Sequence, residues 1–185
     1  MVEPEAASIC HQAALLRTAL LAAVPVTELR GAIPWGVFRY GLSPAWSLAA
    51  ALVGNLVIIP PLMWLISRLV DSVSGWGRWG APLRWWFARV ERKSRLVERY
   101  GALGLALFVA VPLPGTGAWT GCAAAVLFRQ PTRRACLAVA VGVVAAGLAI
   151  TLVTWAVQQG LIQGGGPFLK EVLLPFDMAP PALLV

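Results

Sequence analysis

The chain has 185 residues, of which 59% are hydrophobic and 12% charged, and its formal net charge is +7. Soluble domains of this length are about 45–50% apolar and about 25% charged, so the composition excludes a water-soluble globule and predicts an all-α integral membrane protein. The basic excess does not indicate a nucleic-acid partner, because seven of the fifteen Lys and Arg residues lie within residues 78–100, between two apolar runs. Basic residues in short loops beside membrane spans are typical of the cytoplasmic side.

The first apolar segment, residues 13–26, ends just before Glu28. At about 1.5 Å per residue it covers about 20 Å, which is less than the roughly 30 Å of a hydrocarbon core. Gly31 and Pro34 are expected to break this helix, and a second short apolar piece follows over residues 32–42. Two short arms around a Gly/Pro break predict a re-entrant hairpin, which enters the membrane and leaves it on the same side.

A full span is predicted over residues 45–70, beginning after Ser43-Pro44 and carrying Asn55 near its middle. The basic segment, residues 78–99, then places apolar side chains at spacings of three, four and seven, which is typical of an amphipathic helix on a membrane surface. We expect this linker, about residues 75–99, to lie at the cytoplasmic interface and to have anionic lipid headgroups as partners.

The order of elements in the first part of the chain recurs after residue 100. The recurring elements are a short apolar arm (101–111), a Gly/Pro break (112–121), a second short arm (122–128) and a full span (132–158). An offset of 87 residues aligns Pro25 with Pro112 and Pro44 with Pro131. Internal symmetry of this kind predicts two structural repeats.

The placement of charge predicts that the two repeats have inverted topology. With the basic linker in the cytoplasm, the first hairpin opens to the outside, whereas the second, which is followed by Arg129, Arg133 and Arg134, opens to the cytoplasm. We therefore expect a single membrane domain over residues 1–185. Its parts are repeat 1 (about 13–73), the amphipathic linker (about 75–99), repeat 2 (about 100–160) and a C-terminal tail (161–185) without an assigned role.

Irregular backbone at membrane depth is tolerated where protein buries it or where it lines a water-filled cavity, and the broken helices of transporters build their substrate sites there. Glu28 is the carboxylate within the apolar runs, and Arg30 follows two residues later. Residues two apart point to different faces of a helix but share a face in extended backbone, so the pair is expected at a broken tip. Asn55 and Arg17 are candidate further partners.

The predicted site joins the tips of the two hairpins. The first tip supplies Glu28, Arg30, Gly31 and Pro34, and the second supplies Pro112, Pro114, Gly115, Thr116, Gly117, Trp119, Thr120 and Gly121. Burial disfavours a charged Glu28 whereas Arg30 favours it, so Glu28 is a candidate for binding and releasing a proton. Two alternatives stay open: a permanent Glu28–Arg30 ion pair that only fixes the tip, and direct contact of Arg30 with a ligand such as a phosphate.

The motifs ELRGAIP (28–34) and VAVPLPGTGAWTG (109–121) resemble those of the small multidrug export protein family of prokaryotes, which is distantly similar to the DedA/VTT membrane proteins. The resemblance covers about residues 15–160, and Thr27 stands where the family typically has a proline before the glutamate. It implies an inner-membrane transporter with paired re-entrant hairpins. For the DedA relatives it implies proton-dependent function or translocation of polyprenyl-phosphate and other lipids.

The expected function is that of a small polytopic transporter, a proton-coupled exporter of small molecules, in the cytoplasmic membrane of a prokaryote. The alternatives are a translocase of polyprenyl-phosphate or other lipids, and a non-transporting membrane scaffold. An enzyme, a cofactor and a metal site are not expected, because the apolar segments carry no Ser/His/Asp, Cys/His or metal-ligand cluster. A homodimer is expected, because two hairpins and two spans give little bulk to shield polar tips.

Overall fold

The computed structural model of the chain describes residues 4–73, 81–93, 95–111 and 116–160, and within these ranges it is helical and contains no strand. The helices are α1 (Pro4–Ala23), α2 (Glu28–Phe38), α3 (Pro44–Val73), α4 (Ala81–Lys93), α5 (Arg95–Ala110), α6 (Ala118–Leu127) and α7 (Thr132–Gln158). The prediction of an all-helical fold is confirmed.

Two of these helices are long and apolar enough to cross a membrane, over Pro44–Val70 of α3 and over the whole of α7. Each span has 27 residues, or about 40 Å of helix, which exceeds the roughly 30 Å of a hydrocarbon core. Both begin at or directly after a proline, as predicted, because proline favours the first turn of a helix. The outer surface of α7 keeps large apolar side chains exposed, namely Leu137, Val141, Leu148 and Leu152.

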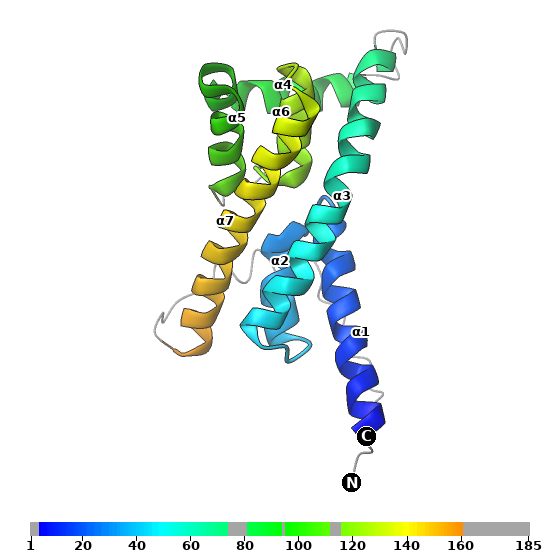
Figure 1. Cartoon of the computed structure of the whole chain (residues 1–185), viewed down its shortest axis with the longest axis vertical. Coiled ribbons are helices and arrows are strands. Elements are labelled where there is room, and N and C mark those ends of the chain that lie inside the picture. The colour runs from blue at the N-terminus through cyan, green and yellow to red at the C-terminus, as the bar shows by residue number, and fades with distance from the viewer. Residues whose placement is uncertain (1–3, 74–80, 94, 112–115, 161–185) are drawn as a thin grey trace.

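Helices α1 and α2 form one hairpin and α5 and α6 another, and the two hairpins occupy opposite halves of the molecule. The first arm was predicted too short, because α1 begins at Pro4 rather than near residue 13 and its 20 residues extend about 30 Å. In Figure 1, α1 and α2 lie in the lower half and α5 and α6 in the upper half, and α3 and α7 run past both. α1 and α2 pack on α3, and α5 and α6 pack on α7. Further contacts join α3 to α6 and α2 to α7. Each hairpin is thereby held between the two long helices, and the core of buried side chains runs through all of them.

The break in the first hairpin lies earlier than predicted. The chain turns at residues 24–27, and α2 then begins at Glu28 and includes both Gly31 and Pro34. The prediction that these two residues break the helix is wrong. A proline inside a helix costs about 3 kcal/mol, but α2 is packed against α1, α3 and α7, and most helical stability in proteins comes from such tertiary packing.

The second hairpin and the linker also differ in their boundaries. The predicted break over residues 112–121 is too long, because α6 already begins at Ala118. Of the predicted amphipathic helix over residues 75–99, residues 75–80 and 94 lie outside the described residues, and the rest belongs to α4 and to the start of α5. α5 kinks at Gly101, where φ is 57°. Three apolar side chains of this segment, Phe87, Val90 and Val97, are buried in the core of the protein, and its placement on a membrane surface stays a prediction.

One glycine in each long helix lets a short helix approach it closely. A Cβ atom at Gly54 of α3 would overlap the backbone carbonyl of Ala19 in α1, and a Cβ atom at Gly142 of α7 would lie 2.7 Å from the carbonyl oxygen of Ala106 in α5. Small residues at helix interfaces allow close backbone packing in membranes. The first helix of each hairpin therefore lies against its long helix in the same manner.

Candidate functional site

Glu28 begins α2 in an unusual backbone conformation. Its φ is 46°, in the left-handed region that a non-glycine residue seldom adopts, and its side chain is only 8% exposed. Its backbone N–H donates to the carbonyl oxygen of Val24 at 2.9 Å, which closes the turn between α1 and α2. A left-handed residue costs on the order of 1–3 kcal/mol, and the rest of the hairpin holds Glu28 in this state.

The Glu28 carboxylate caps the N-terminus of α6, a helix in the other half of the molecule. Oε1 of Glu28 accepts the backbone N–H of Trp119 at 3.3 Å. A helix is normally capped by a side chain of its own N-cap residue, but here that residue is Gly117, whose N–H donates to Oγ1 of Thr120 at 2.9 Å. Because a Cβ atom at Gly117 would overlap the carboxylate, the glycine makes room for an acid from α2.

Arg30 binds the same segment from the first turn of α2, two residues after Glu28. Its guanidinium donates to the carbonyl oxygen of Thr116 and, at 3.0 Å, to Oγ1 of the same residue. Thr116 is buried, and its hydroxyl donates to the carbonyl oxygen of Val111 at 2.7 Å. The opposite charges of Glu28 and Arg30 also attract each other. One hairpin thus presents an acid and a base, and the other presents backbone amides, a carbonyl and a hydroxyl.

The side chain of Trp119 adds a contact from the second hairpin to the first. Its indole Nε1–H donates to the carbonyl oxygen of Ala23 at 3.1 Å, at the C-terminus of α1. In both hairpins a threonine hydroxyl in the turn donates to a backbone carbonyl oxygen near the end of the first helix. The hydroxyl of Thr27 donates to the carbonyl oxygen of Leu21, and that of Thr116 donates to the carbonyl oxygen of Val111. The two tips are therefore built by similar means and are joined through several hydrogen bonds.

The structure brings together most of the predicted site residues that it describes. Glu28, Arg30, Thr116, Gly117, Trp119 and Thr120 all take part in the contacts above. Gly31 and Pro34 lie within α2 and Gly121 within α6, so they are not at the tips. Pro112, Pro114 and Gly115 lie outside the described residues.

Arg17 and Asn55, the two further partners that the sequence suggested, differ in their exposure to solvent. Arg17 is exposed on α1, and no contact with Glu28 is found for it in the described structure. Asn55 is fully buried on α3, and neither Oδ1 nor Nδ2 has a hydrogen-bond partner among the described residues. Asn55 is thus a buried polar group in the interior without a direct bond to the acid or the base.

Sequence reasoning did not name two buried side chains, one beside the site and one that holds α2 against α3. Cys122 of α6 is fully buried, and its thiol lies close enough to Glu28 for an electrostatic interaction. Ser47 of α3 is buried too, and its hydroxyl donates to the carbonyl oxygen of Ile33 at 2.8 Å, which fixes α2 on α3. In the ranges that the structure describes, no group of three or more His, Cys, Asp and Glu residues could hold a metal ion.

These features define a helical membrane protein with a buried acid and a half-buried base where two hairpins meet. The chain belongs to the family described as "Putative small multi-drug export protein", whose pattern matches residues 28–149. The matched range begins at Glu28 and includes both the charged pair and the second tip. No curated protein and no solved structure matches the chain. The relationship to the DedA/VTT proteins stays a prediction.

Proposed function

We propose that this protein is a proton-coupled exporter of small molecules and that Glu28 is the group that exchanges a proton during transport. The observation that carries the proposal is the position of this carboxylate, buried at the junction of the two hairpins and bonded to the α6 amide of Trp119. An ionisable residue within an apolar membrane domain is a candidate for a transport site. The name of the family, a class of exporters, agrees with this assignment.

In this proposal the hairpins are re-entrant and belong to two inverted repeats. The order of two short helices followed by a long one, found twice, supports it, and so does the opposite placement of the two hairpins in Figure 1. The glycine contacts give further support, because Ala19 and Ala106 are separated by the offset of 87 residues and Gly54 and Gly142 by nearly the same interval. The repeats would cross the cytoplasmic membrane of a prokaryote with α4 on the cytoplasmic side.

Protonation would act by weakening the junction. The ionised carboxylate is attracted by the positive end of α6 and by Arg30. A hydrogen bond to a charged group contributes about 1.5–3 kcal/mol, which is roughly a 10- to 150-fold shift between joined and separated tips. A proton on Glu28 leaves a neutral carboxyl group, whose oxygen accepts the same N–H more weakly, so the tips separate more often and a path for a substrate opens. Deprotonation on the other side of the membrane restores the joined state.

The test is proton flux in proteoliposomes under an imposed pH gradient, followed with a trapped pH-sensitive dye. The wild-type protein is compared with Glu28→Gln and with Glu91→Gln, a matched control because Glu91 is exposed on α4. We expect substrate-triggered flux, with small organic cations as the probes, in the wild type and in Glu91→Gln and its loss in Glu28→Gln.

Full flux in Glu28→Gln would contradict the role of Glu28. Transbilayer movement of a fluorescent phospholipid, measured by its quenching from outside, separates the rival function. Lipid movement without proton flux in the wild type would replace the exporter with a lipid translocase.

A further inference from the structure

Three exposed aromatic rings at one end of the molecule each have an arginine guanidinium over the ring. The pairs are Arg68 over Trp64 and Arg89 over Trp85, both at 5.7 Å from the ring centroid, and Arg99 over Tyr100 at 5.3 Å. The three rings are between 49% and 62% exposed. The pairs belong to three different helices, α3, α4 and α5. Within each helix the partners are close in sequence, four residues apart in the first two pairs and adjacent in the third.

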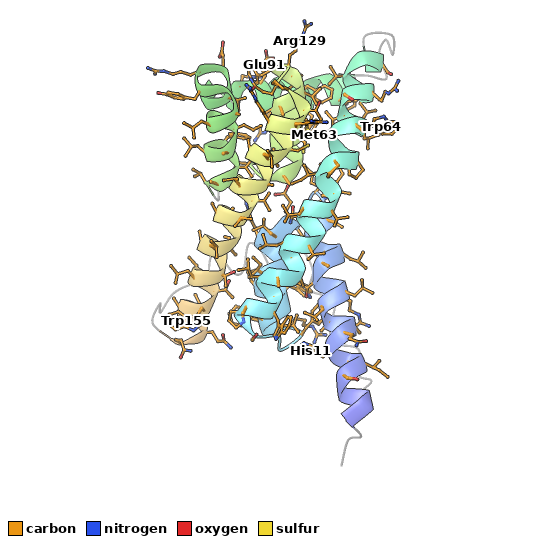
Figure 2. The ribbon with its side chains drawn as sticks, in the orientation of Figure 1. His11, Met63, Trp64, Glu91, Arg129 and Trp155 are labelled. Atoms are coloured by element: carbon orange, nitrogen blue, oxygen red, sulfur yellow. The ribbon has the colours of Figure 1, made fainter. Side chains whose placement is uncertain are left out.

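All three helices meet at the same end of the molecule, which we call the α4 end. In Figure 1, α3 ends and α5 begins beside α4, and Figure 2 shows Trp64, Glu91 and Arg129 toward this end. His11 and Trp155 lie toward the opposite end in the same view. The exposed Trp46 contacts the ring of His11 edge-on at 6.0 Å, so an exposed tryptophan in this chain does not automatically pair with arginine.

The charges at the α4 end are predominantly basic. The described side chains exposed on α4, on the ends of α3 and α5 that adjoin it, in the connection between α6 and α7 and at the start of α7 include seven arginines and two glutamates. The arginines are Arg68, Arg89, Arg92, Arg99, Arg129, Arg133 and Arg134, and the glutamates are Glu91 and Glu98. A surface with this excess attracts anionic headgroups.

The arginine–aromatic pairs can orient a phosphate group as well as attract it. Tryptophan and tyrosine favour the level of the headgroups at a membrane surface. A guanidinium over a ring is stabilised by the ring face and still offers N–H groups in a fork that matches a phosphate. Each pair therefore combines a ring that fits the interface with a donor set that fits a phosphodiester.

We propose that the α4 end binds the phosphate groups of anionic phospholipids and that the three arginine–aromatic pairs are its contact points. The α4 end is part of the packed protein, because α4 packs against α6 and buries Phe87 and Val90 in the core. Bound lipid therefore rests on a helix that directly supports α6, whose N-terminus carries the Trp119 amide bonded to Glu28. The proposal does not depend on the exporter function.

The test compares the effect of phosphatidylglycerol and phosphatidylcholine on the melting temperature of the detergent-solubilised protein. The pair variant carries Arg68→Gln, Arg89→Gln and Arg99→Gln. The matched control carries Arg92→Gln, Arg133→Gln and Arg134→Gln, which remove the same charge from exposed positions at the same end. A third variant, with Trp64→Leu, Trp85→Leu and Tyr100→Leu, keeps every charge and removes the rings.

We expect phosphatidylglycerol to raise the melting temperature of the wild type by about 4 °C or more above the value in phosphatidylcholine. The pair variant and the ring variant should lose most of this difference, and the control should keep at least half of it. If the pair variant and the control lost the same part of this difference in melting temperature, net charge alone would explain the lipid effect, and the proposal would be overturned. An unchanged difference in the ring variant, or the absence of any difference in the wild type, would also overturn it. Because all substituted side chains are exposed, melting in phosphatidylcholine should change little.

Discussion

The carboxylate of Glu28 accepts the backbone N–H of Trp119 at 3.3 Å across 91 residues of chain. The acid stands at the N-terminus of a helix to which it does not belong, at a position where that helix has a glycine. The bond joins the two halves of the molecule through a group whose charge can change.

Replacement of Gly117 by alanine should disrupt the junction as effectively as loss of the acid. The added Cβ atom would overlap the Glu28 carboxylate, so either the acid or the start of α6 must move. We expect a loss of about 1–3 kcal/mol in the free energy of unfolding and the same loss of proton flux as in Glu28→Gln. Ala145→Val, which adds volume at an exposed position of α7, is the control. Normal proton flux in Gly117→Ala would show that transport does not depend on the position of the Glu28 carboxylate beside Gly117.

Asn55→Leu should make the protein more stable. The amide is fully buried and has no hydrogen-bond partner in the described part of the chain, and a buried polar group without a partner costs about 1–3 kcal/mol. Leucine has a similar size and removes that cost. Thermal unfolding in detergent should show a higher melting temperature for Asn55→Leu. Ser47→Ala, which removes a hydroxyl that donates to Ile33, should show a lower one. A lower melting temperature for Asn55→Leu would mean that the amide is bonded in the native protein.

Gly54→Ala and Gly142→Ala should destabilise the protein by similar amounts. Each substitution places a Cβ atom against the carbonyl group of a short helix, at Ala19 or at Ala106. We expect about 1–3 kcal/mol for each, and an additive effect in the double variant because the two contacts lie in different halves. Chemical unfolding in mixed micelles measures all three. A large effect at one glycine and none at the other would argue against equivalent roles for the two contacts.

The three cysteines should react with N-ethylmaleimide at different rates. Cys10 is exposed, Cys136 is partly buried and Cys122 is fully buried beside the site, so the order of labelling should be Cys10, Cys136 and then Cys122. Mass spectrometry of the labelled protein over time gives the three rates, and labelling in denaturing detergent provides the reference in which burial no longer protects them. Glu28→Gln should accelerate the labelling of Cys122 selectively, because the junction that covers α6 is weakened. Equal labelling rates of Cys122 in the wild type and in Glu28→Gln would show that the junction does not protect this thiol from the reagent.

The long helices could be predicted from the sequence because their signals are local. Uninterrupted apolar runs and the prolines at 44 and 131 determine where α3 and α7 begin. The break of the first hairpin could not be placed, because Gly31 and Pro34 are helix breakers in isolation and are tolerated only by the packing of α2 against three other helices. The close contacts at Gly54 and Gly142 had a readable signal, since Ala50 precedes Gly54 and Ala138 precedes Gly142 by four residues.

The charged pair was recognised as a candidate site from the cost of burying Glu28 and Arg30. Its partners on the second tip were named as a group, but their individual roles depend on tertiary contacts. No local pattern shows that Gly117 leaves α6 without a side-chain cap for Glu28 to supply, or that Arg30 reaches Thr116. The expectation of extended backbone at the pair was wrong, because Glu28 is left-handed and Arg30 is helical.

The distance along the chain between the acid and its partner has a consequence for biosynthesis. At about 5–20 residues per second, a ribosome needs roughly 5–20 s to make the 91 residues that separate Glu28 from Trp119. During that interval the first hairpin reaches the membrane with a carboxylate whose bonding partner has not yet been synthesised. Arg30 is the one strong compensating charge already present beside it. Because the base stands two residues from the acid in the sequence, the two charges at the tip of the nascent hairpin sum to zero during that interval.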